Sequence, residues 1–340
     1  MIIFFLSFFI FLLNAYLLVL QENIDYKKRN FDFSLYGKKY AHEFDDLEFK
    51  IFLANKTKKN ILLGSSTSMT FRPDLLNANY FNSSKGNIKM SEIKYFLKNL
   101  KYDPKNIIIF IDPYHFNKNF PEISKSNIDL VYKFKHNIYS SDIKFYYYLQ
   151  KNILIFAKFG QVIKDFKKNY LQIFTLEKND KKIGFNAKLF NSGFRKDGSF
   201  KYPDQYLNDI RVDENEAFDL TKYSKSNLYF GENNDFTENY ESKLSFLVSK
   251  NINYKKKILV VLNVVESNFL SEVKSNKNYN QFIKKYKNIC KYLIENDIKC
   301  IDKVEFAYES KINSNLFFDP FHYRYKLSNL ILKDVLEYTK

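Results

Sequence analysis

Residues 60–68 read Asn-Ile-Leu-Leu-Gly-Ser-Ser-Thr-Ser, a short apolar run that stops at a Gly/Ser turn. A run of this kind, bounded by turn residues, predicts a buried β-strand. Four later segments have the same character and predict four more strands, at 79–82, 106–111, 257–264 and 298–301. Continuous apolar strands are typical of a parallel sheet whose two faces are both covered.

Apolar residues also recur three and four positions apart, which predicts amphipathic helices between and after these strands. The stripes are Met90, Ile93, Leu97 and Leu100; Phe282, Tyr286, Ile289 and Leu293; and Leu327, Ile331 and Val335. Strands that alternate with helices indicate an α/β fold. We therefore expect a three-layer α/β/α sandwich with a mostly parallel sheet.

Polar residues follow several of the predicted strands directly. They occupy 64–68, 82–86, 112–115 and the chain from Asn263 onward. In open parallel sheets, sites form at the carboxyl ends of the strands. These four segments are therefore expected to converge on one edge of the sheet.

A Ser/Thr-rich strand exit is matched, near the other end of the chain, by Asp319-Pro320-Phe321-His322. A serine becomes a nucleophile when a base removes its proton, and that base needs a carboxylate to orient it. The first segment offers the serine and the second offers the histidine and the aspartate. Together they suggest acyl-transfer chemistry.

The chain at this point resembles the SGNH (GDSL-like) hydrolase superfamily. It looks most like the membrane-anchored branch, which includes proteins of alginate O-acetylation and lipoteichoic-acid D-alanylation. Residues 64–68 resemble the nucleophile block, 82–86 the second block, 107–112 the third strand and 319–322 the final block. Residues 116–256 are not covered by the resemblance. It implies an SGNH-like, flavodoxin-like version of the α/β sandwich.

The resemblance assigns a role to each matching residue. Ser66 would be the nucleophile, His322 the general base and Asp319 the group that orients it. The backbone N–H groups of Ser66 and Gly86 would form the oxyanion hole. Losing one such donor typically lowers the rate about 10²–10³-fold. No cofactor is implied.

The third block departs from the family pattern. The usual Gly-x-Asn-Asp, whose Asn donates to the oxyanion, is replaced by Asp112-Pro113-Tyr114-His115. Members of the anchored branch also lack that motif. Asp112 and His115 are therefore possible accessory residues, and the missing donor disfavours fast hydrolysis.

Other assignments remain open from the sequence. Ser65 and Ser68 are rivals of Ser66, and the whole turn could be a helix N-cap. His115 could be the base in place of His322, or a structural histidine packed among aromatic rings. The two Asp-x-x-His pairs, Asp112/His115 and Asp319/His322, could instead hold a metal ion. We expect no metal, and His42 and His136 carry no partner signature.

The N-terminus contains an uncharged stretch, residues 2–20, rich in Phe, Leu and Ile. Nineteen helical residues span roughly 28 Å at about 1.5 Å each, which fits a bilayer core. We expect a transmembrane anchor at 1–21, a stalk with short helices at 22–58, and an SGNH-like domain at 59–340. That domain carries a largely helical insertion at about 116–256, with a helix over 140–166 and a loop over 191–203.

The orientation of the anchor is contested. Lys27, Lys28 and Arg29 follow the span, and the positive-inside rule would place the domain in the cytoplasm. The resemblance implies a periplasmic or other extracytoplasmic domain, and we rank it higher. It also implies an envelope glycan or its acyl donor as substrate, and a membrane-bound O-acyltransferase as partner.

The formal net charge is +16, but the lysines are scattered in short clusters without an arginine-rich stripe. This pattern predicts a solvated surface with some attraction to acidic envelope polymers or lipid headgroups, and no specific nucleic-acid binding. Cys290 and Cys300 match no zinc-binding spacing. The sequence leaves their pairing open and favours two buried thiols.

The sequence thus leads to an anchored serine acyltransferase or esterase that modifies a cell-envelope polysaccharide. A carboxylester hydrolase is the alternative within the same chemistry. A non-catalytic scaffold that keeps the fold and docks an assembly partner is the alternative outside it.

Overall fold

The computed structural model describes residues 43–120, 191–202, 231–249 and 254–339, together with residue 9 and the short strands at 35–36 and 182–183. The chain divides into two compact units. One comprises 1–42 and 124–195, and the other comprises 43–123 and 196–340. The candidate site lies wholly in the second unit.

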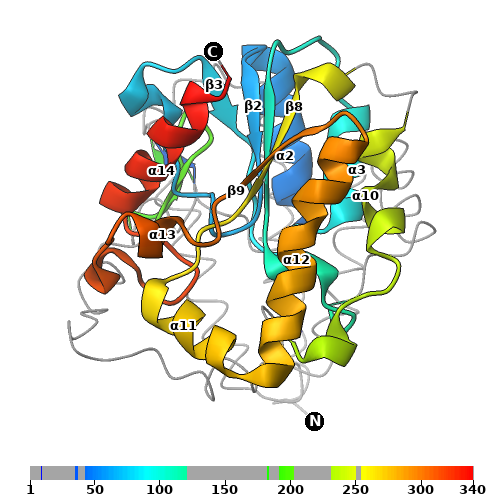
Figure 1. Cartoon of the computed structure of the whole chain (residues 1–340). Helices are drawn as coiled ribbons and strands as arrows, with labels where there is room; N and C mark the ends of the chain where they lie inside the picture. Colours follow the sequence, from blue (N-terminus) through cyan, green and yellow to red (C-terminus); the bar gives the residue numbers. More distant parts are fainter. Residues whose placement is uncertain are drawn as a thin grey trace. The chain divides into compact units, whose positions relative to one another are not determined.

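The second unit is built on a five-stranded sheet, whose strands lie among the helices in Figure 1. Its strands are β2 (Asn60–Leu63), β3 (Tyr80–Asn82), β4 (Ile107–Ile111), β8 (Ile258–Leu262) and β9 (Lys299–Asp302). They are ordered β3-β2-β4-β8-β9, and every pair is parallel. The predicted α/β class and mostly parallel sheet are confirmed. All five strands fall on the predicted apolar runs.

This strand order is 2-1-3-4-5 when the five strands are counted along the chain. It is one of the two common doubly wound orders, and its connections reverse direction between the first and third strands. Here that switch point lies between β2 and β4. Ligand sites of such sheets lie outside the carboxyl ends of the strands at the switch point. The Gly/Ser turn follows β2 directly, so it lies at this place.

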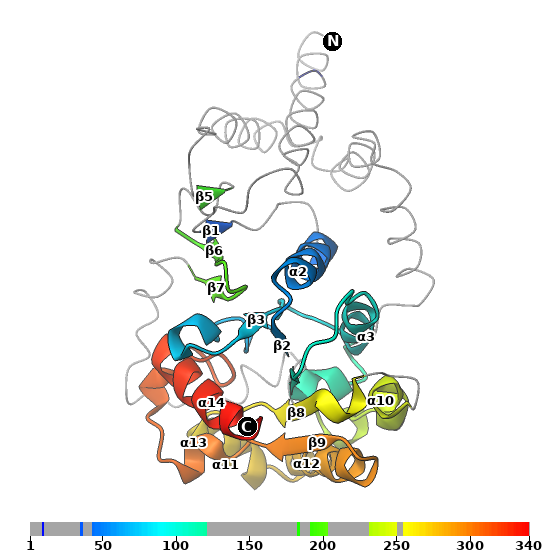
Figure 2. The same cartoon turned by 90° about the horizontal axis from the view of Figure 1, so that it is seen from above.

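Helices lie on both sides of the sheet, with α14 on one side and α3 on the other (Figure 2). The helices of this unit are α2 (Glu43–Thr57), α3 (Met90–Lys98), α10 (Tyr240–Val248), α11 (Ser267–Ser275), α12 (Lys277–Glu295), α13 (Phe306–Glu309) and α14 (Tyr325–Glu337). Short 3₁₀ helices occur at η1 (Pro73–Leu76), η2 (Pro113–Phe116), η3 (Asn233–Asp235), η4 (Lys255–Lys257) and η5 (Ser314–Leu316). The predicted amphipathic helices correspond to α3, α12 and α14.

Burial explains why the central strands are apolar without interruption. Alternate strand residues point to opposite faces of a sheet. Leu62, Phe110 and Val261 belong to one buried cluster with Ile331 and Val335 of α14. Their neighbours along each strand face the other layer, where α12 packs against β8 and β9. Both faces of β2, β4 and β8 are therefore apolar, as expected for a covered parallel sheet.

Two expectations about the flanking segments change. Residues 22–58 were expected to form a stalk, but α2 belongs to the same compact unit as the sheet and buries Leu47, Leu53 and Ala54. The stretch 191–203 was expected to be a loop, and it contains two short strands, β6 (Gly193–Phe194) and β7 (Phe200–Lys201). In the first unit, β1 (Leu35–Tyr36) pairs parallel with β5 (Lys182–Ile183) and antiparallel with β6.

Other expectations lie outside the described residues. These are the helix over 140–166, the segment around His136, and all of the apolar stretch 2–20 except residue 9. Within the part of the chain that the structure describes, no helix is both long and apolar enough to cross a membrane.

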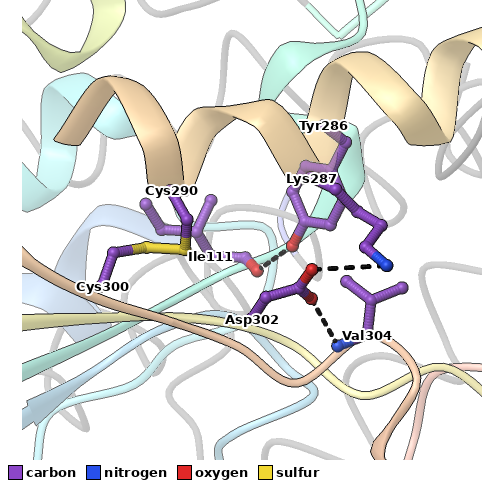
Figure 3. The surroundings of a disulfide bond; sticks show 7 residues. All are labelled: Ile111, Tyr286, Lys287, Cys290, Cys300, Asp302 and Val304. Atoms are coloured by element: carbon purple, nitrogen blue, oxygen red, sulfur yellow. Dashed lines mark hydrogen bonds and ion pairs between the residues drawn. A yellow bond between two sulfur atoms is a disulfide. The ribbon is translucent and has the colours of Figure 1, made fainter. Parts of the chain in front are cut away.

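The two cysteines form a disulfide between α12 and β9, so the interpretation as free thiols is wrong (Figure 3). The Cα atoms of Cys290 and Cys300 are 5.2 Å apart. The sequence did place them on a helix and on the following strand, but whether side chains on two such elements face each other depends on packing. One helical turn away, the Tyr286 hydroxyl donates to the carbonyl of Ile111 at 2.5 Å. The bridge therefore fastens the helix that also supports the end of β4.

Candidate active site

Ser66 is presented to solvent by a turn that is otherwise buried. From Ile61 to Phe71, every residue except Ser66 is buried. The turn leaves β2 at Gly64, whose position has no room for a side chain. A Cβ there would lie 2.2 Å from the Ser68 hydroxyl and 2.9 Å from the Cβ of Phe110. The glycine thus lets the turn approach β4, and Ser66 is the one partly exposed residue of the turn.

Ser66, His322 and Asp319 form a continuous hydrogen-bonded chain. The Ser66 Oγ lies 2.8 Å from His322 Nε2, and His322 Nδ1 lies 2.7 Å from Asp319 Oδ2. An aspartate accepts, so Nδ1 carries the imidazole proton and Nε2 is left as the acceptor of the Ser66 proton. This is the geometry that a base-activated nucleophile requires.

The loop from Phe317 to Tyr323 is braced so that its histidine faces the turn. The loop closes on itself through the Phe318 N–H, which donates to the His322 carbonyl at 2.8 Å. Asp319 Oδ1 accepts the backbone N–H groups of Phe321 and His322, each at 2.9 Å. Both carboxylate oxygens of Asp319 are thereby engaged, one on the backbone and one on the imidazole.

A second set of contacts fixes this loop to the end of β8. The Glu266 N–H donates to the Pro320 carbonyl at 3.0 Å, and the Tyr323 hydroxyl donates to the Val264 carbonyl at 3.1 Å. Glu266 is fully buried and its carboxylate caps α11 by accepting the Phe269 N–H. The histidine loop is therefore held by the segment that connects β8 to α11.

The protonation of the pair follows from its surroundings. Burial lowers the pKa of His322, but the hydrogen bond and charge of Asp319, with a smaller effect of Asp112, outweigh it and raise that pKa above its ordinary value. Burial raises the pKa of Asp319, and the hydrogen bond to His322 with the two backbone donors reverses this and lowers it. Asp319 is thus an anion that favours the imidazolium form of His322.

The two rival serines of the turn are buried and engaged elsewhere. Ser65 is fully buried and its hydroxyl donates to Asp112. Ser68 is also fully buried, and its hydroxyl lies 3.1 Å from the Ser65 carbonyl oxygen and 3.0 Å from the Ser84 hydroxyl. Of the three serines, Ser66 is the one whose hydroxyl contacts an imidazole. The geometry therefore favours Ser66 as the nucleophile.

The segment that contains Gly86 runs beside the Gly64–Ser68 turn, which we call the nucleophile turn after the role that the sequence predicts for Ser66. The Ser83 N–H donates to the Leu62 carbonyl at 2.7 Å, and the Lys85 N–H donates to the Gly64 carbonyl at 3.0 Å. Within the described residues, the backbone N–H groups of Ser66 and Gly86 have no acceptor. Both remain available to a ligand, as an oxyanion hole requires.

A buried ion pair holds this second segment in place. Lys85 Nζ lies 2.9 Å from Glu92 Oε1, and both side chains are 2% exposed. The other oxygen of Glu92 accepts the Lys89 N–H at the start of α3. This pair could not be predicted, because a spacing of seven residues across a turn matches no local sequence pattern.

Asp112 and His115 are not arranged like Asp319 and His322, because the Asp112 carboxylate does not hold the His115 ring. His115 is 1% exposed, its Nδ1 accepts the backbone N–H of Asp112 at 3.0 Å, and its ring stacks on Tyr114 with centroids 4.2 Å apart. The Asp112 carboxylate instead turns toward Ser65, Thr67 and Asn263. No group of three or more His, Cys, Asp or Glu side chains suited to a metal ion occurs among the described residues.

Thr67, Asn263 and Asn82 were not predicted as individual contributors. Asn82 donates to the carbonyls of Ser68 and Phe71 at 2.9 Å each and thus ties the turn to β3. The sequence did indicate the location of both asparagines, because Asn82 and Asn263 stand at strand ends on the edge where polar groups were expected. Which atoms they contact depends on strand neighbours far away in the sequence.

No protein-family model matches the chain, and no curated protein matches it either.

Proposed function

We propose that this chain is a membrane-anchored serine acyltransferase or esterase with an SGNH-like α/β/α fold, acting on a cell-envelope polysaccharide or its acyl donor. One observation carries the proposal: the hydroxyl of the partly exposed Ser66 lies 2.8 Å from the Nε2 of a histidine that is itself held by a carboxylate. The strand order and the position of Ser66 at the switch point support it further.

The proposed reaction has two balanced steps. In the first, Ser66 Oγ attacks the acyl carbon of a donor ester while His322 Nε2 takes the serine proton. The bond to the donor alcohol then breaks, His322 returns the proton to the leaving oxygen, and the acyl group remains on Ser66. In the second, an acceptor hydroxyl attacks the acyl-serine and gives its proton to His322. Ser66 recovers that proton as the acyl group leaves on the acceptor.

Each residue has a defined contribution. The N–H groups of Ser66 and Gly86 would stabilise the oxyanion, and each is worth about 10²–10³ in rate in comparable enzymes. Asp319 would stabilise the imidazolium that forms in each step. The Asn side chain that supplies a third oxyanion donor in the resembling family is replaced here by Asp112, whose carboxylate accepts hydrogen bonds from Ser65 and Asn263. Transfer to a bound acceptor is therefore favoured over fast general hydrolysis.

The disulfide supports an extracytoplasmic location. Disulfides persist in oxidising compartments and are rare in the cytosol, where thiols are kept reduced. A bond between Cys290 and Cys300 fits a domain exported past the anchor expected at 1–21. It weighs against the orientation suggested by the basic residues that follow the span. A membrane-bound O-acyltransferase that supplies the acyl group stays part of the proposal.

A fluorophosphonate probe tests the chemistry, because it labels activated serines. We expect the full chain to be labelled and Ser66→Ala to be unlabelled. The control is Ser271→Ala, an exposed serine on α11 whose hydroxyl donates to the Ser267 carbonyl, and it should be labelled like the wild type. A folded wild type that resists labelling under all conditions would favour the non-catalytic scaffold.

A product assay with an acyl donor and a glycan distinguishes transfer from hydrolysis. Accumulation of acylated glycan would indicate transfer, and release of free acid alone would indicate hydrolysis.

A further inference from the structure

The carboxylate of Asp112 is buried beneath the nucleophile turn and is surrounded by donors. It is 1% exposed. The Ser65 hydroxyl donates to Oδ2, the Thr67 hydroxyl lies 3.2 Å from Oδ1, and the Asn263 amide lies 2.8 Å from Oδ1. Each of these neighbours can donate, so both carboxylate oxygens can accept a hydrogen bond here. Among the described residues, no lysine or arginine pairs with it.

These contacts hold both neighbours of Ser66 and leave Ser66 itself out. Ser65 and Thr67 point down to Asp112, while Ser66 points to His322. Asn263 adds a brace, because its amide donates to the Thr67 hydroxyl at 2.9 Å as well as to Asp112. The ends of β2, β4 and β8 are thus joined directly under the nucleophile.

We propose that Asp112 is a positioning residue of the site, whose buried carboxylate fixes the direction of Ser66 and whose charge favours the imidazolium form of His322. This inference rests on the proposed function, since it concerns the same serine and histidine. It assigns to the site a second carboxylate, in addition to that of Asp319.

The charged groups around the imidazole are consistent with this role. Burial lowers the pKa of His322, while the hydrogen bond and charge of Asp319, with a smaller effect of the charge of Asp112 directly after β4, raise it. Arg324, two residues further along, has its guanidinium over the ring of Phe318, 4.7 Å from the centroid. The Glu266 carboxylate, behind the loop, is occupied by the Phe269 N–H and the Ser314 hydroxyl.

The charge has a chemical consequence. When His322 takes the proton of Ser66, a cation forms in a partly buried place, and nearby anions lower its free energy. Asp112 adds to the effect of Asp319 without touching the ring. The Asp112 carboxylate cannot donate to the oxyanion, so binding of the oxyanion depends on the backbone N–H groups of Ser66 and Gly86.

The test is an NMR titration of His322, which is practical because the chain has four histidines. We compare the wild type with Asp112→Asn and Thr67→Val, and assign the signal with His322→Gln. Asp112→Asn should lower the His322 pKa and slow fluorophosphonate labelling by about tenfold or more, since small misplacements of reacting groups are costly. Thr67→Val keeps the charge, so it should slow labelling and leave the His322 pKa unchanged.

Equal His322 pKa values in Asp112→Asn and the wild type would overturn the electrostatic part of the proposal. If Asp112→Asn does not fold, Asp112→Ser replaces it, because its smaller side chain leaves room for a water among the donors. A wild-type His322 that titrates at or below the ordinary value of histidine would also contradict the proposal, without any variant. The titration needs no catalysis, so a negative result there is distinct from a failure of Ser66 to react.

Discussion

At the scale of single residues, reactivity depends on the proton of His322. Ser66 can be activated while Nε2 is unprotonated, and the pKa of His322 is raised, chiefly by Asp319, against the opposing effect of burial. Labelling should therefore fall on the acid side, with a midpoint above the ordinary pKa of histidine. The sign follows from the charge: an anion beside the imidazole stabilises its protonated form.

Asp319→Asn should shift that profile in a predictable direction. Without the carboxylate, the imidazolium loses its partner and the His322 pKa falls, so the midpoint of labelling moves to lower pH. The plateau rate should drop by roughly a hundredfold or more, because the base is no longer oriented. Rates measured across the pH range for both proteins give the result. An unmoved midpoint would show that Asp319 does not act on His322.

At the scale of elements, the segment 196–202 is attached to β3 by the Asn82 N–H, which donates to the Asp197 carbonyl at 2.7 Å. The same segment brings the buried side chain of Asp197 to the exposed carboxylate of Asp74 in η1. Asp197 lies beside Asp74, and its Oδ2 is buried without a donor among the described residues. Burial and the neighbouring Asp74 raise the pKa of Asp197 to about 6, while Asp74 has a pKa lowered to about 2. Over the range between these values the two carboxyl groups hold one proton between them.

Asp197→Asn should therefore alter the pH dependence of stability. A carboxyl whose folded pKa is raised contributes stability below its ordinary value, and this contribution is lost as the pH rises through about 6. The asparagine oxygen can still accept from Ser199, and its amide can donate to Asp74. The free energy of unfolding of the variant should gain on the wild type by on the order of 2 kcal/mol between about pH 4 and pH 7. Urea unfolding at both pH values measures the difference, and a constant difference would contradict the shared proton.

The strands could be predicted from the sequence because they depend on local pattern, whereas the contacts of the site could not, because they join residues far apart in the chain. The strands at 60–63 and 107–111 could be predicted because a covered parallel strand must be apolar at every position. The loop around Gly198 could be predicted from its glycines. Its attachment could not, because Lys50, which donates to the Gly198 carbonyl, lies far away in the sequence. The Ser66–His322 contact joins residues 256 positions apart and needed the family resemblance.

At the scale of the whole molecule, the disulfide links stability to compartment. It joins α12 to β9, the edge strand of the sheet, across ten residues. Closing a loop of this length should stabilise the fold by about 2–3 kcal/mol through the unfolded state. The chain as isolated from an oxidising compartment should contain no free thiol at these positions. The sequence could place both cysteines on neighbouring elements, but it could not place their side chains face to face.

Cys290→Ser combined with Cys300→Ser tests this contribution. The double variant should lose about 2–3 kcal/mol of unfolding free energy relative to the oxidised wild type. Reducing the wild type should reproduce most of that loss, whereas reduction of the variant should change nothing. A variant as stable as the oxidised protein would show that the bridge does not stabilise the fold.

The central claim is that His322 activates Ser66, and locating the covalent adduct tests it most directly. The full chain is treated with a fluorophosphonate above the His322 pKa, digested, and analysed by mass spectrometry beside His322→Ala. We expect a single phosphonyl group on the hydroxyl of Ser66 in the wild type and labelling slowed by at least about a hundredfold in the variant. An adduct on Ser65 or Ser68, or equal labelling of Ser66 without His322, would contradict it.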